Sequence, residues 1–497
     1  MTSPNGRRLM LVLAAFALLG AAGCFPTRES IYSDLYASRR QSYARWARAE
    51  GEEEALPRMS GDLGLQDAVR VGLAYNQTLQ RALQEKLKGE GRVLTAYGEA
   101  LPQLDLSAGY TRLDQVFVVD LGVDSFQVGD KNNWSYQLNL TQPIFKGGAI
   151  PAAIRGAVLF RYWGDERVRQ AVQDVVVQTA QAYYGVLLAA RLYEVQEESL
   201  RFAEANLRNV VARQEQGVAI RYDRLRAELD VASARAELIR QRNELSRART
   251  GLFRAMGVSQ KSEVELTDQL TYLPMEPNYD EAVREAFMNR PNLFRAELDL
   301  RLQQEVLRGL FSEYWPQLEA WGWFRWAKPD PHEQSNIEWD RQWQAGLGLT
   351  WTLFDGLRRE GNIIQQRAVA RQSAIELADR EQAVLQEVRT ALLDLNDASE
   401  LVDSQRLNLE QANEALRLVT VGAREGVNTE LEVLDARAAL TRARGDYYQA
   451  LHSHALARLR YRRAVGVLGP APGDAEVPEE APQLEAAASD SAPQHSG

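Results

Sequence analysis

The sequence contains two copies of one unit in tandem, and this repeat limits the possible folds more than any other feature. The pair Gly217-Val218 recurs as Gly426-Val427, 209 residues later. Further landmarks recur at the same offset: Leu138 as Leu347, Phe145 as Phe354, Gly147 as Gly356, and Gly257 as Gly466. We therefore expect both halves of the chain to adopt the same fold.

The repeat also predicts the domain organisation. Leu101-Pro102-Gln103-Leu104 returns as Trp315-Pro316-Gln317-Leu318, shortly before a strand-like segment in each half. We assign residues 61–266 to the first repeat, with a β-hairpin at 103–145. Residues 267–469 form the second repeat, with a β-hairpin at 317–354. Each repeat thus reads as helix, two strands, then long helices.

The hairpin segments have the periodicity of amphipathic strands. Tyr136, Leu138 and Leu140 alternate with polar residues, and one polar set recurs across both halves: Asp105, Ser135, Gln137, Asn139, Gln344 and Thr350. A tilted strand of about 9–11 residues spans a bilayer, with one face toward lipid and the other toward a lumen. A soluble sheet with one solvated face has the same pattern.

Tryptophan favours the membrane interpretation. Eight of the 10 tryptophans lie at or beside the hairpins: Trp134, Trp315, Trp321, Trp323, Trp326, Trp339, Trp343 and Trp351. Such crowding is typical of the aromatic girdles at a membrane surface. Trp321 and Trp323 depart from this pattern, because their parity along the strand is that of the polar face.

Four strands from one chain cannot close a barrel, because single-chain barrels need at least eight and hydrocarbon does not tolerate an open sheet edge. Two chains would supply eight strands, which side chains fill. Three chains would supply twelve, enough to leave a lumen. The strand count favours a trimer if the protein is a channel.

The remainder of each half is predicted to be helical. The stretch from Gly148 to Gln216, if wholly helical, is about 100 Å long. A later stretch has apolar residues at the four-three spacing of a coiled coil: Leu225, Leu229, Ala232, Ala236 and Ile239. A stack of ordinary amphipathic helices is the alternative interpretation.

The N-terminus has the pattern of an exported lipoprotein. Arg7 and Arg8 precede the apolar run of residues 9–22, and small residues lead into Cys24, the single cysteine. We predict a signal peptide at 1–23, an acylated Cys24 carrying diacylglycerol and a fatty acyl chain, and an N-terminal segment at 24–60. Residues 470–497 are rich in Pro, Ala and acidic residues and should be disordered.

Other function classes find little support. A net charge of −10 without a basic stripe argues against nucleic acid. His452 and His454 are two apart on a predicted helix, so they do not face each other as metal ligands would. No GxSxG, HExxH or P-loop motif occurs. We expect neither an enzyme nor a metal or other cofactor.

In order along the chain, the motifs resemble those of the TolC-like outer-membrane efflux factor family, in its lipoprotein branch. The resemblance extends from about Leu63 to Gly466. It rests on Leu65-Gln66-Asp67-Ala68, on Pro143-Ile144-Phe145 before Gly147-Gly148, and on residues 426–436, which read GVNTELEVLDA.

The resemblance implies a mixed α/β membrane protein: a homotrimer with a 12-stranded β-barrel, four strands per chain, on a long α-helical coiled-coil tunnel. It implies the outer membrane of a Gram-negative-type bacterium, with the tunnel extending into the periplasm. The partners would be outer-membrane lipid, a periplasmic adaptor and an inner-membrane pump of the RND, ABC or MFS type. The function would be the exit step of a tripartite efflux or type I secretion system.

The resemblance also implies site residues at the helix tips. Gly217, Val218, Gly426 and Val427 correspond to the turns that contact the adaptor, and Glu432, Asp435 and Asp223 to acids around the periplasmic gate. Ala423 and Asn428 stand where a locking Tyr and Arg occur in the family, and Arg424 is a possible partner of Asp223 instead. The alternative function is a lipid-anchored periplasmic adaptor or a structural coiled-coil protein without its own pore.

Overall fold

The computed structural model describes residues 28–49, 56–120, 122, 125–333 and 336–469. This part of the chain divides into two compact units. The smaller comprises residues up to Ser60 together with Val258–Glu263, and the larger comprises Gly61–Gly257 and the residues from Val264 onward. The predicted signal peptide, Cys24 and the acidic tail lie outside the described residues.

The smaller unit contains helix α2 (Arg28–Ala49) and a short segment pairing. The Ser259 N–H donates to the Pro57 carbonyl at 3.1 Å, and the Glu263 N–H donates to the Met59 carbonyl at 2.9 Å. The Met59 N–H donates to the Ser262 hydroxyl at 3.1 Å. These bonds join two segments that are about 200 residues apart in sequence. Strands β1 (Ser60–Leu63) and β6 (Glu263–Leu266) form a two-stranded sheet.

The larger unit repeats its elements in matched lengths, as the duplication predicts. Helix α3 (Leu65–Tyr75) matches α7 (Tyr279–Asn289), and α4 (Gln77–Gly98) matches α8 (Pro291–Phe311). Helices α5 (Ala149–Glu215) and α9 (Arg358–Arg424) both have 67 residues. Helices α6 (Arg221–Met256) and α10 (Glu430–Val465) both have 36. A 3₁₀ turn, η1 (Ser312–Tyr314), follows α8. The helices of the described chain all lack the combination of length and apolarity needed to cross a bilayer.

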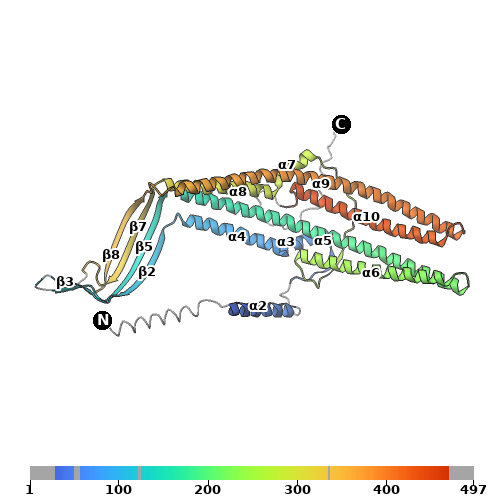
Figure 1. The fold of residues 1–497 in the computed structure, drawn as a ribbon, viewed down its shortest axis with the longest axis horizontal. Coiled ribbons are helices and arrows are strands. Elements are labelled where there is room, and N and C mark those ends of the chain that lie inside the picture. The colour runs from blue at the N-terminus through green and yellow to red at the C-terminus, as the bar shows by residue number, and fades with distance from the viewer. Residues whose placement is uncertain (1–27, 50–55, 121, 123–124, 334–335, 470–497) are drawn as a thin grey trace. The chain divides into compact units, whose positions relative to one another are not determined.

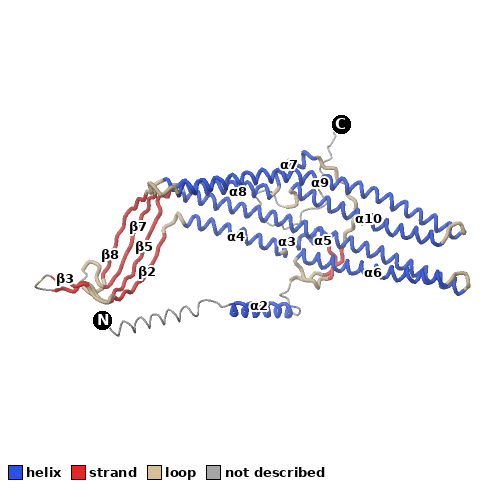
Figure 2. The backbone as a smooth tube through the Cα atoms, in the orientation of Figure 1, coloured by secondary structure: helices blue, strands red, loops and turns tan. Residues whose placement is uncertain are grey.

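The strands β2, β5, β7 and β8 gather at one end of the larger unit, and the α5–α6 and α9–α10 hairpins turn at the other end (Figures 1 and 2). The sheet order is β2 (Gln103–Arg112), β5 (Asn132–Lys146), β7 (Gln317–Lys328) and β8 (Asp340–Thr350), and every neighbouring pair is antiparallel. The expected polar loop between β2 and β5 instead contains a small hairpin of β3 (Phe117–Asp120) and β4 (Ser125–Val128).

The register confirms that the sheet has one apolar and one polar face. Leu138 lies between Leu106 and Phe324, and Phe324 pairs onward with Trp343. The next row along, on the other face, is polar at most positions: Asp105, Asn139, Trp323 and Gln344. The expected polar residues thus share a face, and Trp321 and Trp323 lie on it with them.

The helical core lies where the short helices pack beside the long ones. In the second half, buried residues from α7 to α10 form one cluster that includes Ala286, Val388, Leu395 and Val465. The first half has equivalent buried positions, among them Val69, Val176 and Met256. Burial of these apolar side chains contributes most of the stability of this region.

The predicted coiled-coil stripe of α6 is wrong as a contact within one copy. Leu225, Leu229 and Ile239 are 54%, 65% and 48% exposed. The residues that α6 buries along this stretch are Ala227 and Val231, on a different face of the helix. The small side chains there let α5 and α6 approach closely, and the larger apolar stripe stays uncovered in the single copy.

Candidate functional site: the helix tips and the two-faced sheet

The two helix tips have the same turn geometry. Gly217 follows α5 and Gly426 follows α9, each with φ of 76°. The Val218 N–H donates to the Arg213 carbonyl, and the Val427 N–H donates to the Gly422 carbonyl, both at 2.8 Å. This is the helix-ending motif that requires a left-handed residue, which explains glycine at both positions.

Each turn leaves an apolar side chain open to solvent. Val218 is 66% exposed and Val427 is 79% exposed. A Cβ added at Gly217 or Gly426 would meet no atom within 4 Å among the described residues. The four residues assigned to adaptor contact therefore form bare ends of the two hairpins in a single copy.

Glu432 has a structural role that the sequence interpretation did not include. Its carboxylate accepts from the Thr429 N–H at 2.7 Å and from the Asn428 side chain at 3.1 Å. The Thr429 hydroxyl in turn accepts from the Glu432 N–H at 3.3 Å, so the two residues form a capping box at the start of α10. The hydrogen bond from the Thr429 backbone lowers the pKa of Glu432, with help from Asn428. Glu432 is therefore held ionised at neutral pH.

Asp223 is the counterpart of Glu432 in the first repeat. Its carboxylate accepts from the Ile220 N–H at 3.1 Å, at the start of α6. Asp435 has a different setting, because it lies one turn further into α10, is exposed, and corresponds in the repeat to Arg226. Among the described residues, no hydrogen bond or ion pair joins Asp223 to Glu432, to Asp435 or to Arg424. Within one copy the predicted acids are neighbours along helices rather than one bonded cluster.

Ion pairs that the sequence interpretation missed tie the second hairpin to the first. Arg213, in the last turn of α5, pairs with Glu430, in the first turn of α10. Further along, Glu198 of α5 pairs with Arg437 at 2.7 Å and with Arg444. Burial raises the pKa of Glu198, but the two arginines, Arg444 first, outweigh it and lower that pKa overall. The sequence shows a basic residue in the last turn of α5 and an acidic residue in the first turn of α10. The sequence spacing does not predict that these two residues pair, because they are 217 positions apart.

A cavity of about 550 Å³ lies between the two hairpins near these pairs. Its lining is mostly polar and includes Asn209, Arg424, Asn428 and Glu430, with Phe202 at the α5 side. Arg424 thus faces this cavity. The tip region therefore combines bare apolar turns with a charged, water-accessible groove.

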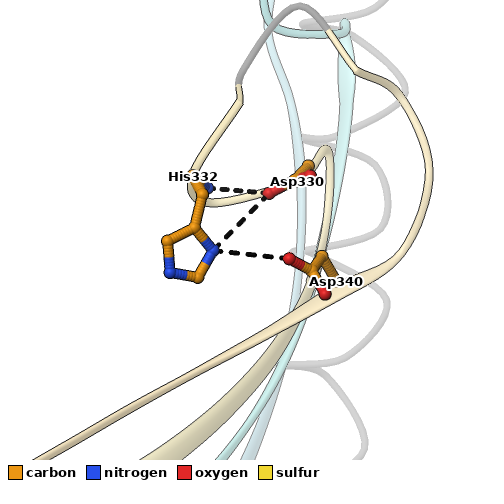
Figure 3. Close-up of side chains that lie close together, drawn as sticks. All are labelled: Asp330, His332 and Asp340. Carbon is orange, nitrogen blue, oxygen red and sulfur yellow. Dashed lines mark hydrogen bonds and ion pairs between the residues drawn. The ribbon is translucent and has the colours of Figure 1, made fainter.

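One further group has the donor chemistry of a metal site (Figure 3). His332 Nδ1 lies 3.7 Å from an Asp330 oxygen and 3.4 Å from an Asp340 oxygen. The same Asp330 oxygen already accepts the N–H groups of His332 and Glu333, at 2.8 and 3.2 Å. These hydrogen bonds join residues within the β7–β8 loop, so we interpret the group first as a structural element that stabilises this loop.

The apolar face of the sheet is uncovered in the single copy. Leu106 is 73%, Leu347 70% and Trp343 72% exposed. Leu106 lies on β2, and Trp343 and Leu347 lie on β8, so these side chains come from the two edge strands of the sheet. An uncovered apolar surface of this kind marks a binding or membrane surface.

Comparison with known proteins supports the predicted resemblance. The chain is 25% identical over 416 residues to the alkaline protease secretion protein AprF of Pseudomonas aeruginosa, covering 82% of this chain and 85% of the relative. It is 22% identical over 440 residues to the outer membrane protein TolC of Escherichia coli, covering 82% and 85%. The solved structure of the Campylobacter jejuni CmeC outer membrane channel has the same fold, with a TM-score of 0.72 at 15% identity, covering 82% and 87%.

The family comparison matches the chain twice, once in each repeat. The sequence model described as outer membrane efflux protein covers residues 70–258 and again residues 282–467. The two matches fall on the two halves that the sequence repeat defines, and together they span most of the chain. They displace the adaptor and structural coiled-coil alternatives. The chain belongs to the outer membrane efflux protein family.

Proposed function

We propose that three copies of this chain close a 12-stranded barrel in the outer membrane and extend it into the periplasm as a helical tunnel. The observation that carries the proposal is the four-stranded sheet with two free edges. Within the described residues, β2 pairs only with β5, and β8 pairs only with β7. Open edges beside an exposed apolar face are not tolerated in hydrocarbon, so the edges need partners from other copies.

The strand directions suit such closure. The order β2-β5-β7-β8 is antiparallel throughout, so the two edge strands run in opposite directions. β8 of one copy can then pair with β2 of the next in the same antiparallel pattern. Bacterial barrels have an even number of antiparallel strands, and three copies satisfy this rule with a lumen wide enough for cargo.

The uncovered stripe on α6 gives separate support for assembly. Leu225, Leu229 and Ile239 lie on one helix face and are exposed in a single copy. Apolar residues at this spacing pack against a neighbouring helix in coiled coils. A second copy beside α6 would bury them, which accounts for the difference between the sequence prediction and the packing within one chain.

The tips are the proposed meeting point with the export machinery. Val218 and Val427, on the turns at Gly217 and Gly426, would contact a periplasmic adaptor that connects the tunnel to an inner-membrane pump of the RND, ABC or MFS type. The relative AprF is described as a secretion protein. Efflux and type I secretion both require an exit duct of this kind.

The acids at the tips are the proposed gate. Three copies would bring three each of Glu432, Asp435 and Asp223 toward one axis. Carboxylates within about 8 Å of one another interact at physiological salt, favouring cations and repelling anions. The lowered pKa of Glu432 keeps part of this charge in place.

The lipid anchor remains a proposal about Cys24. A diacylated N-terminal cysteine adds a second membrane attachment to that of the barrel. Mass spectrometry of the mature N-terminus should find the acyl groups on Cys24. Cys24→Ser should remove them and still leave an inserted barrel. An unmodified mature N-terminus at another residue would contradict the anchor without touching the channel.

The channel itself is tested by assembly and conductance together. Purified protein should have the mass of three copies and should conduct ions in planar bilayers. Single cysteines in β2 (Ser107) and β8 (Gln342 or Gln344), combined in one Cys24→Ser chain, should cross-link neighbouring copies into covalent trimers. A chain with cysteines at Gln137, on the internal strand β5, and at Gln344 is the matched control and should not cross-link copies. Monomers without conductance would overturn the proposal.

A further inference from the structure

Two tryptophans lie on the polar face of the sheet, where aromatic girdles give no reason for them. Trp321 pairs across the sheet with Thr141 on one side and Gly346 on the other. Trp323 pairs with Asn139 and Gln344. Since residues two apart in a strand share a face, both indoles lie beside polar neighbours and opposite to Phe324.

Gly346 makes room for the first indole. A Cβ at Gly346 would lie 2.9 Å from Cζ2 and 3.2 Å from Cε2 of Trp321, closer than packed atoms allow. The ring therefore covers the backbone at Gly346. A flat ring laid over a glycine presents its other π face away from the sheet.

Glu319 brings a negative charge to the same place. A Cβ at Gly348 would lie 3.6 Å from the Trp321 indole nitrogen, 3.6 Å from Glu319 Cγ and 3.7 Å from a Glu319 carboxylate oxygen. Glu319 and the edge of the Trp321 ring thus converge over Gly348. Arg325, two residues beyond Trp323 on the same face, bounds the other end of this surface.

We propose that Trp321, Trp323 and Glu319 form a binding ledge for organic cations that carry a flat aromatic ring system. The inference rests on the proposed channel, in which the polar face lines the lumen and three ledges surround the path of the cargo. A cation is attracted by the electron-rich face of an indole, and a flat ring stacks on it. The positive end of the ligand lies toward Glu319, because Arg325 repels it from the other side.

The other side chains on the polar face of the sheet explain why the ledge would affect which cargo binds. Most of the neighbouring polar-face side chains are neutral amides and hydroxyls, such as Gln137, Asn139 and Gln344, which compete poorly for an aromatic cation. The carboxylate of Asp105 lies two strands away from Trp323 in the same row. Transport needs sites that hold a cargo briefly and release it. A shallow ledge repeated three times satisfies both conditions, and it would favour one chemical class among the possible cargoes.

The test uses the full-length trimer in nanodiscs of neutral phosphatidylcholine, with ethidium as the probe and fluorescence anisotropy as the measurement. The wild type should bind ethidium. The double variant Trp321→Gln with Trp323→Gln should bind about tenfold more weakly, the size expected for loss of stacking and cation–π contact. Trp343→Gln, on the apolar face, should bind like the wild type.

Two glycines provide a matched pair that keeps both tryptophans. Gly346→Ala places a methyl group against the Trp321 ring and should weaken ethidium binding several-fold. Gly348→Ala makes only ordinary contacts at 3.6 Å and should change it little. Glu319→Gln should weaken binding of ethidium more than binding of an uncharged aromatic probe of similar size.

Each variant is first checked for trimer mass and conductance. If the wild type conducts, and the variants conduct but bind ethidium with unchanged affinity, the ledge is wrong and the channel stands. If Trp343→Gln weakens binding as much as the double variant, the probe binds at the lipid surface and the ledge is again wrong. If the double variant does not assemble, Gly346→Ala against Gly348→Ala decides. Absence of conductance in the wild type would instead overturn the proposed function.

Discussion

Leu138→Arg is the substitution that most directly tests which face of the sheet meets lipid. Leu138 sits midway along β5, between Leu106 and Phe324, with its side chain 39% exposed on the apolar face. An arginine on the lipid face of a barrel costs about 2–4 kcal/mol at the bilayer midplane. A trimer carries three copies, so the cost for the assembly is about 6–12 kcal/mol.

Asn139→Arg is the matched control, one residue along the same strand. Asn139 lies on the opposite face, between Asp105 and Trp323. An arginine there would face water and a carboxylate, and we expect a change within about 1 kcal/mol, as for an exposed site.

The assay is folding into phosphatidylcholine vesicles, followed by denaturant titration and by the fraction of trimer that resists dissociation in mild detergent. Leu138→Arg should shift the unfolding midpoint strongly and reduce insertion, while Asn139→Arg should behave like the wild type. No loss in either variant would mean that both faces of the sheet meet water, and equal losses would mean that the two faces do not differ in their exposure to lipid. Either result would contradict the barrel assignment.

Three other substitutions follow from particular contacts. Gly257→Ala should destabilise the protein by about 3 kcal/mol or more in denaturant titrations, because its Cβ would lie 2.5 Å from the Tyr75 carbonyl oxygen. The control Gly217→Ala has a similar φ but open space around the added Cβ, and should cost only about 1–2 kcal/mol. Equal losses in the two variants would refute the clash. Glu432→Gln with Asp435→Asn should weaken cation preference in bilayer recordings without changing helix content, since glutamine can keep the capping box, and unaltered selectivity in a conducting trimer would contradict the gate. His454 is fully buried, and burial lowers its pKa from 6.5 to about 4. As the pH falls from 6.5 toward 4, the unfolded chain binds a proton at this histidine and the folded chain does not, so the free energy of unfolding falls by about 3 kcal/mol. His454→Leu should flatten that part of the stability–pH curve, and an unchanged slope would show that other groups cause it.

The features that could be predicted are those set by local pattern. Alternation assigns a face to each strand residue, so Leu138 and Asn139 were separated correctly. Glycines followed by valine marked both helix turns, because a left-handed C-terminal residue is a local requirement. The predicted helical stretch from Gly148 to Gln216 contains α5, and its counterpart in the second repeat is α9, each of 67 residues.

The features that were missed depend on partners far away in sequence. The apolar stripe at Leu225 and Leu229 has coiled-coil spacing, but spacing does not say whether the partner helix belongs to the same chain. Glu432 was expected to serve a gate, and its capping bond to Thr429 is a second use of the same carboxylate. The pairing of Arg213 with Glu430 joins separate hairpins, and local periodicity carries no information about such pairs.

Each of the two long helices is held closely at its sheet end, so a small tilt there is amplified along its length. At the sheet end, a Cβ on Gly147 would overlap the Ser312 carbonyl, and Arg359 donates to the Glu313 carbonyl at 2.9 Å. A helix of 67 residues is about 100 Å long, so a tilt of about 3° at the sheet end moves the opposite end by about 5 Å. A small change in the tilt of α5 or α9 at the sheet would therefore produce a much larger displacement of the helix tips.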